Sequence, residues 1–244
     1  MKKNLFLNFT LKYYFFYKLY LYYNLYIRNF KYLFQKSYSQ FNEDIFLKKY
    51  FSKNNGFYID IGCHHPTKFN NTYLLYKSGW YGLNIDLSKI SIDLFNVFRP
   101  RDININSAIS DTKKRINFYI PNNNLLSPEI TIDKKFMRKL AKHHKNLYNT
   151  FITYTTTFDK IKNRFIKNIK SIDLLKIDIE GLDFKVLKTI NLQNLSPELI
   201  MIEAPSFDKK IRSKIIRYLK YHNYKLIFKN NLNIICKSEC SKTF

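Results

Sequence analysis

From residue 39 onward, short apolar and β-branched runs alternate with segments of helical periodicity. Strands buried in a parallel sheet consist of near-continuous apolar residues, and helices connect them across both faces of the sheet. The pattern therefore predicts an α/β fold with a mostly parallel sheet. The predicted strands cover residues 57–61, 81–85, 103–109, 172–177 and 199–203.

Capping residues support helices between these runs. Ser39 and Ser88 precede helical segments, and Gly79 follows one, as expected for residues that begin and end helices. The predicted helices cover residues 39–50, 71–78, 88–98, 182–190 and 207–221.

Three further segments look extended. Residues 115–120 read as a short strand and residues 151–157 as an extended stretch, while YKLIFKNNLNIICKS, near the C-terminus, contains two strand-like runs around Asn230 and Asn231. The last pair predicts an antiparallel hairpin. The expected fold is Rossmann-like, with seven principal strands and a C-terminal hairpin.

Residues 1–36 differ in composition from the rest and predict a separate N-terminal helical extension. They are rich in aromatic residues, but Lys12, Lys18, Asn24, Arg28 and Lys31 interrupt any apolar span of about 20 residues. No small-residue cleavage site suggests a signal peptide. Two alternatives stay open: peripheral contact with an anionic membrane, or packing as an extra helix on the domain or on a partner chain.

Residues 37–244 are predicted to form one domain with an insert at about residues 121–150. The insert is rich in Asn and Pro at first and then basic over residues 132–145, where it contains His143 and His144. A segment of this length between elements is typical of a lid or a substrate loop.

Charge and cysteine content narrow the class of protein. The net charge of +24 is scattered along the chain without an Arg-rich tract or a nucleic-acid-binding motif, which argues against nucleic acid as the partner. Cys63, Cys236 and Cys240 make an odd number without a framework spacing, so a reducing, cytoplasmic location is expected, peripheral to the membrane if the extension binds lipid.

Acidic residues lie at the ends of four predicted strands. Asp60 and Gly62 end the first, and Asp86 ends the second at close to the separation of about 20 residues at which an acid holds a ribose diol. Asp178 and Glu180 follow the fourth, and a further acid, Glu203, ends the fifth. Because ligands bind at the carboxyl ends of parallel strands, these acids predict a nucleotide-like cofactor, although the chain lacks GxGxxG for a dinucleotide.

Several segments in the same order resemble the FkbM family of methyltransferases. They are SQ with ED at residues 39–44, YIDIGCHHPTKFNNTYLLYKSGWYGLNID, RPRDININSAIS, TTTFDKI, DLLKIDIEGLDFKVLKTI and a strand ending in IE. The likeness covers about residues 37–236. It implies a class I methyltransferase fold, S-adenosylmethionine as cofactor, and O-methylation of a sugar, glycan or secondary-metabolite hydroxyl.

The resemblance also implies roles for individual residues. The implied cofactor-binding residues are Asp60 and Gly62 at the methionine part, Asp86 at the ribose hydroxyls, Ser107 and Ala108 beside the adenine, and Asp178 facing the cofactor amino group or the substrate.

Transfer to a hydroxyl benefits from a general base, and His has the unperturbed pKa nearest to neutral. His65 and His64 are the first candidates, followed by Glu180 and Asp178. A divalent metal held by Asp178, Glu180, Glu203 and a nearby His is an alternative way to activate the acceptor.

Two other classes of function remain as alternatives. The first is a nicotinamide-dependent oxidoreductase on a similar sheet, which the missing GxGxxG disfavours. The second is a non-catalytic scaffold that binds a membrane or a partner through residues 1–36.

Overall fold

The computed structural model describes residues 13–122, 124, 126–127, 130–132, 134–144 and 148–239. Its helices are α2 (Tyr14–Tyr23), α3 (Glu43–Tyr50), α4 (Tyr73–Lys77), α5 (Lys89–Phe98), α6 (Lys134–His144), α7 (Phe158–Phe165), α8 (Asp183–Thr189), α9 (Leu192–Leu195) and α10 (Lys209–Tyr221). Its strands are β1 (Phe57–Ile61), β2 (Tyr81–Asp86), β3 (Ile103–Asn106), β4 (Ala108–Ile109), β5 (Arg115–Pro121), β6 (Tyr148–Thr156), β7 (Leu174–Ile177), β8 (Leu199–Glu203), β9 (Tyr224–Lys229) and β10 (Asn233–Ser238).

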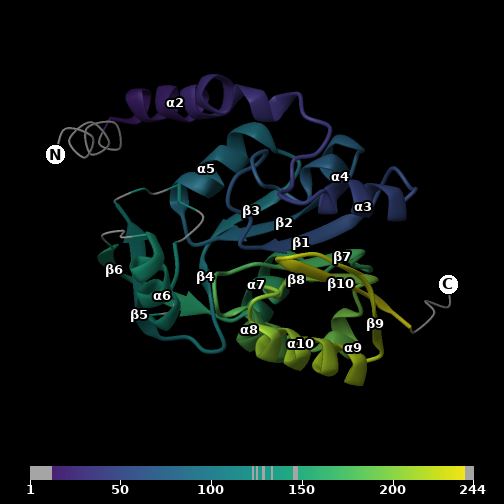
Figure 1. The fold of residues 1–244 in the computed structure, drawn as a ribbon. Helices are drawn as coiled ribbons and strands as arrows, with labels where there is room; N and C mark the ends of the chain where they lie inside the picture. The colour runs from purple at the N-terminus through teal and green to yellow at the C-terminus, as the bar shows by residue number, and fades with distance from the viewer. Residues whose placement is uncertain are drawn as a thin grey trace.

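A seven-stranded sheet with the order β3-β2-β1-β7-β8-β10-β9 forms the centre of the molecule (Figure 1). The first five strands in this order are parallel, and β10 is antiparallel to both of its neighbours. The predicted Rossmann-like sheet and its C-terminal hairpin are therefore confirmed.

Each face of the sheet has its own apolar core. In β1, Ile59 and Ile61 pack against residues of α7, α8 and α10, whereas Tyr58 points to the other face, toward α3 and α4. This alternation follows from the two-residue period of a strand. Asp60 has the same parity as Tyr58 and is also completely buried, so a carboxylate lies inside the core on the α3–α4 side.

Two predicted boundaries were wrong. Residues 103–109 are not one strand: β3 ends at Asn106, and the chain leaves the main sheet at Ser107, whose backbone N–H donates to the carbonyl of Asp86. The helix predicted from residue 39 begins at Glu43, because the carboxylate of Asp44 accepts hydrogen bonds from Ser37, Tyr38 and Ser39 and holds them in a loop.

A second, three-stranded sheet with the order β4-β6-β5 stands beside the main one, next to α6 (Figure 1). All of β5 pairs antiparallel with residues 148–154 of β6, and β4 runs parallel to the last two residues of β6. The extended stretch predicted over residues 151–157 therefore belongs to this sheet, and the helix α7 that follows it was not predicted. The side chains of His143 and His144 and all of Cys240 lie outside the described part of the chain, whereas Cys63 and Cys236 are buried free thiols.

The N-terminal segment crosses the outside of α5 (Figure 1). After α2 the chain continues as a π-helical turn, η1 (Asn24–Arg28), and a 3-10 turn, η2 (Phe30–Leu33). Leu21 and Leu25 are buried against Ile90 and Leu94 of α5. Among the described residues, no helix is both long enough and apolar enough to cross a bilayer.

Candidate functional site

A cavity of about 740 Å³ opens at the carboxyl ends of the parallel strands. Its volume lies within the range of small-molecule sites. Eight of the residues proposed for the site from the sequence line this cavity, namely Gly62, His64, Asp86, Ser107, Ala108, Asp178, Glu180 and Glu203. Asp60 and His65 are not among the lining residues.

Gly62 lets the loops after β1 and β7 meet. Its φ of +83° is unfavourable for side chains, and a Cβ at this position would lie 1.7 Å from the carbonyl oxygen of Asp178. The backbone N–H of Gly62 donates to the carbonyl of Ile85, which joins the same loop to β2. Glycine is therefore required for the cavity wall to close at this point.

Asp60 does not line the cavity but holds Lys176, which does. Its carboxylate accepts a hydrogen bond from Lys176 Nζ at 3.0 Å and another from Thr72 Oγ1 at 3.2 Å. Lys176 lines the cavity, donates to the carbonyl of Gly62 and lies 3.5 Å from Asp178. Burial alone would lower the pKa of Lys176, but the carboxylates of Asp60 and Asp178 outweigh it and hold that pKa above its ordinary value.

Asp86 lies at the end of β2, where its carboxylate organises two loops. One oxygen accepts the backbone N–H of His64 at 2.8 Å, and the other accepts that of Ser88 at 2.7 Å. Burial nevertheless raises the pKa of Asp86 to about 6. Each carboxylate oxygen has a second lone pair, which leaves capacity for hydroxyl donors from a ligand.

Three carboxylates lie close together after β7 and at the end of β8. One oxygen from each of Asp178, Asp183 and Glu203 lies within 4.8 Å of the others. Asp183 is fixed by the backbone N–H groups of Ile179 and Gly181. The side chain of Asp178 is recessed but keeps 32% of its surface accessible from the cavity.

The proximity of these acids changes their protonation. Burial, followed by repulsion from the neighbouring carboxylates, raises the pKa of Asp183 to about 7 and that of Glu203 well above its ordinary value. Burial also raises the pKa of Asp178, against the opposing charge of Lys176. A carboxylate whose pKa is raised in this way is a stronger base than an ordinary one, which is the property needed for a general base.

The two histidines after β1 have different positions. His64 lines the cavity, and burial followed by the charges of Lys68 and Lys176 lowers its pKa to about 3. His65 is 2% exposed, and its Nδ1 accepts the backbone N–H groups of Thr67 and Lys68. This geometry gives His65 a role in holding the loop in place of the catalytic role that the sequence analysis proposed.

Among the lining residues that were not proposed from the sequence, Lys176 and Ser91 bear most directly on the chemistry of the site. The sequence contains a signal for Lys176, because a lysine inside the apolar run LLKI requires a buried acidic partner. Ser91, in the first turn of α5, is 1% exposed, and its Oγ has no hydrogen-bond partner in the described part of the chain. A buried hydroxyl without a partner beside a cavity is suited to hydrogen bonding with a ligand, and no sequence signal distinguishes it.

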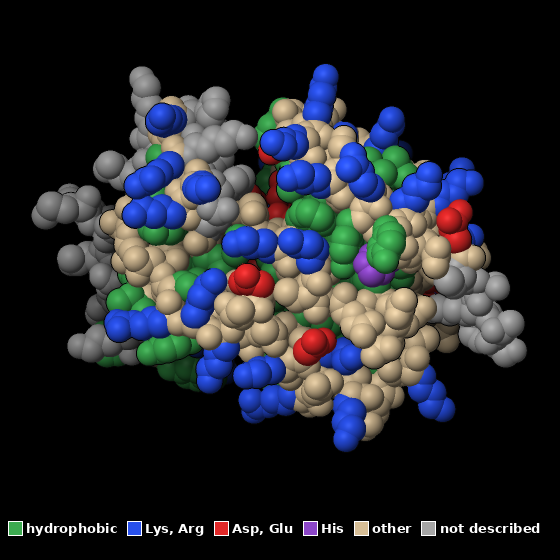
Figure 2. Space-filling model, turned by 90° about the horizontal axis from the view of Figure 1, so that it is seen from below, with side chains coloured by type: hydrophobic (Ala, Val, Ile, Leu, Met, Phe, Trp, Pro, Cys, Tyr) green, Lys and Arg blue, Asp and Glu red, His purple; other side chains and the backbone are tan. Residues whose placement is uncertain are grey.

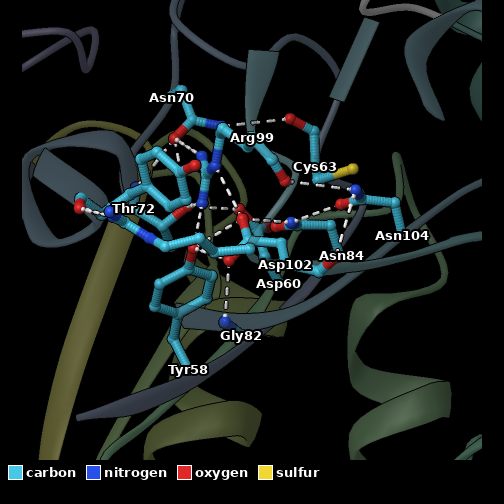
Figure 3. Close-up of polar contacts among 12 residues, drawn as sticks. Tyr58, Asp60, Cys63, Asn70, Thr72, Gly82, Asn84, Arg99, Asp102 and Asn104 are labelled. Atoms are coloured by element: carbon cyan, nitrogen blue, oxygen red, sulfur yellow. Dashed lines mark hydrogen bonds and ion pairs between the residues drawn. The ribbon is translucent and has the colours of Figure 1, made fainter. Parts of the chain in front are cut away.

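A second buried polar cluster adjoins Asp60 (Figure 3). Arg99 donates from Nε to Asp102 at 2.8 Å and from its other nitrogens to Asn70, Thr72 and Tyr58. Asp102 also accepts hydrogen bonds from Tyr58, from Asn84 and from the backbone N–H of Gly82. We call these residues the Arg99 cluster, and Thr72 connects it to Asp60.

Comparison with known proteins shows what the chain is similar to. Residues 60–226, more than half of the 244 residues, match the methyltransferase FkbM domain. Among solved structures, a TehB-like SAM-dependent methyltransferase from Corynebacterium glutamicum shares 10% identity and a TM-score of 0.43, over 82% of this chain and 89% of that chain. No curated protein matches the chain.

Proposed function

The chain belongs to the FkbM methyltransferase family, and on this premise we propose that it transfers the methyl group of S-adenosylmethionine to a hydroxyl oxygen of a sugar, glycan or secondary metabolite. The family supports dependence on S-adenosylmethionine, and it replaces the alternative of a nicotinamide-dependent oxidoreductase. The hydroxyl acceptor rests on the resemblance of the motifs to enzymes that methylate such oxygens.

The carboxylate-rich wall of the cavity beside the Gly62 turn carries the proposal. S-adenosylmethionine has a positive sulfonium and a positive ammonium group, which a concave, acidic wall attracts. Asp178 supplies that charge, while Asp86 and the unpartnered hydroxyl of Ser91 are suited to a nucleoside. The donors and acceptors present therefore fit the cofactor.

Bound S-adenosylmethionine supplies a methyl group that is already activated by the positive sulfur. The chain then has three tasks: to hold the donor, to align the acceptor oxygen with the methyl carbon, and to exclude water. Lys176 stays protonated because it pairs with Asp60, so it fixes the loop at Gly62 and does not take a proton from the acceptor.

We assign the general base to the pair Asp178 and Glu203. Their raised pKa values mean that one carboxylate of the pair can accept the hydroxyl proton as the oxygen attacks, with the proton moving to a carboxylate oxygen. Glu180 lines the same wall and stays a candidate. His64 is neutral at physiological pH but too weakly basic for this task, given its lowered pKa of about 3.

A divalent metal is the second candidate for acceptor activation. The oxygens of Asp178, Asp183 and Glu203 are close enough together to share one ion, and hard oxygen ligands of this kind suit Mg²⁺. The set differs from the one expected from the sequence, because Asp183 takes the place of Glu180. Transfer rates measured with EDTA and then with added Mg²⁺ decide between this candidate and a metal-independent base.

Two carboxylate-to-amide variants test the proposal. Asp86→Asn is expected to weaken binding of S-adenosylhomocysteine by about 10–100-fold, because hydrogen bonds to a charged group contribute about 1.5–3 kcal/mol. Glu203→Gln is expected to leave that binding within about threefold and to lower kcat by about 10²–10⁴, the usual contribution of a general base. Calorimetry measures the first effect, and release of S-adenosylhomocysteine with a panel of hydroxyl acceptors measures the second. An equal loss of affinity in both variants would contradict the assignment, and calorimetry that detects NAD but not S-adenosylhomocysteine would overturn the proposal.

A further inference from the structure

The N-terminal segment, residues 13–34, has one covered face and one uncovered face. Its inner side chains pack on α5, as described above. Most of its exposed side chains are apolar or aromatic. We call nine of them, which are between 42% and 76% exposed, the aromatic face: Phe15, Leu19, Tyr23, Ile27, Phe30 and Phe34, with Tyr14, Tyr22 and Tyr26 at its edge beside α5.

Helix α10 on the opposite side of the molecule shows what an ordinary water-facing surface looks like in this chain. Seen from that side, Lys and Arg side chains project across the surface, and hydrophobic side chains form only small patches among them (Figure 2). On this face positive charge is spread among small apolar patches, whereas the outer face of the N-terminal segment is largely apolar. A helix that is apolar on both sides is normally covered on its outer side by a membrane or by another protein surface.

The charges around the aromatic face indicate what covers it. Lys18, Arg28 and Lys31 are exposed within the segment, and the sequence contains no Asp or Glu before Glu43. Tyrosine rings and lysines without acids are favoured at the headgroup level of a bilayer, where rings lie in the interface and ammonium groups reach lipid phosphates. Protein partners usually carry cations as well as acids, and their cations would require acidic side chains on this segment. The segment offers none.

We propose that the aromatic face docks on an anionic lipid bilayer, with α2 lying along the headgroup region. The ten described residues of α2 are too few to span a bilayer. Docking on this face also affects the cavity wall. Asn29 Nδ2 lies 3.5 Å from His65 Nε2, and the rings of Tyr32 and Phe69 are 5.9 Å apart, with Phe69 lining the cavity. The loop after β1 is therefore held between the docked segment and the cavity.

A fluorescent reporter tests the contact directly, since the chain has a single tryptophan, Trp80, which is completely buried. Phe15→Trp in the full chain is expected to show a blue shift with vesicles of 30% phosphatidylglycerol in phosphatidylcholine and quenching by brominated acyl chains, because interfacial helices bury their apolar face about 5–10 Å deep. Tyr221→Trp on α10 is the matched control and is expected to show neither effect. Equal quenching of the two reporters would overturn the proposal.

Flotation of the same vesicles measures affinity. The variant F15S/Y22S/I27S is expected to bind at least about 30-fold more weakly, because three apolar side chains no longer enter the interface. The control I45S/Y154S/Y221S, at exposed apolar positions elsewhere, is expected to bind as the unaltered chain does. Thermal melting and binding of S-adenosylhomocysteine confirm that both variants fold.

Two further outcomes separate a membrane from other occupants. K18Q/R28Q/K31Q is expected to lose the preference for anionic over zwitterionic vesicles, with about fivefold weaker binding for each charge removed. If F15S/Y22S/I27S floats as well as the control, or if it instead abolishes a concentration-dependent dimer seen by sedimentation velocity without lipid, the face contacts something other than a membrane and the proposal fails.

Discussion

Asp60 lies between two buried polar clusters that differ in how completely their charges are paired. On one side, every charge of the Arg99 cluster has a partner: Arg99 and Asp102 are ion-paired at 2.8 Å with side chains that are completely buried. On the other side, Lys176 is the ammonium that faces Asp60 and Asp178, while Asp183 and Glu203 add two more carboxylates.

The difference shows which of the two clusters is built for chemistry. A paired, fully hydrogen-bonded cluster keeps its protonation state and fixes the positions of the segments that it connects. Burial, together with an excess of like charges, raises the pKa values of Asp183 and Glu203, so these carboxylates bind a proton or a cation more readily than ordinary ones do. The first cluster is thus part of the framework, and the second is part of the site.

The largest effect is expected from breaking the paired cluster. Arg99→Met leaves Asp102 charged and buried, and removing one partner of a buried pair costs about 3–5 kcal/mol. Since about 1 kcal/mol shifts Tm by roughly 2–4 °C in a chain of this size, thermal melting should show a decrease of about 6–20 °C. The control is Lys89→Met, which removes a solvent-exposed pair with Asp93 and should change Tm by less than 2–3 °C, or about 1 kcal/mol. A similar Tm for both variants would mean that the Arg99 cluster is not part of the framework.

A double-mutant cycle on Lys176 and Asp60 sharpens the comparison at its boundary. Lys176→Met should cost about 3–5 kcal/mol in urea unfolding, because it leaves Asp60 buried without its counter-charge. Adding Asp60→Asn removes that charge, so the double variant should recover at least about 1.5 kcal/mol, within the usual coupling of contacting residues. Additive losses in the double variant would show that the two side chains do not act as a pair.

The pH dependence of stability separates the acidic cluster from the paired one. The pKa of Glu203 is raised in the folded chain, so the charged form of Glu203 destabilises the fold. This loss of stability is absent below the unfolded pKa of about 4.3 and complete above the raised folded pKa. Glu203→Gln should therefore raise the Tm of the ligand-free chain by about 2–4 °C at pH 8, which corresponds to roughly 1 kcal/mol, and by clearly less at pH 4.5, which lies close to the unfolded pKa. Asp102→Asn, in the paired cluster, should lower Tm at both pH values. A gain for Glu203→Gln that is the same at pH 4.5 and pH 8 would exclude charge repulsion as its cause.

The smallest effect concerns a single hydroxyl. Ser91→Ala should leave Tm within about 1–2 °C, since its Oγ makes no hydrogen bond within the described chain, and should weaken binding of S-adenosylhomocysteine by about 2–10-fold, the contribution of one neutral hydrogen bond. Ser78→Ala, at the residue that follows α4, removes a hydroxyl that donates to the carbonyl of Leu74 and should not alter that affinity. Calorimetry on both variants checks the assignment, and unchanged binding in Ser91→Ala would remove this residue from the cofactor site.

Much of the fold could be predicted because its signals are local. The run at residues 57–61, the cap at Ser88 and the hairpin around Asn230 each depend on neighbouring residues, and the structure confirms all three. The prediction failed where a distant contact redirected the chain, as at Ser107, whose N–H bonds to Asp86, and before Glu43, where Asp44 holds the preceding loop.

The sequence by itself determined that acids end β1, β2, β7 and β8 and that a glycine follows the first of them, because parallel strands bring their carboxyl ends to one edge of a sheet. Only the tertiary structure decided which of these acids are available to a ligand. Asp60 is neutralised by Lys176, 116 residues away, whereas Asp86 and Asp178 line the cavity, and His65 is committed to backbone amides of its own loop. Pairing between side chains depends on distances between remote segments, and periodicity along a chain carries no information about those distances.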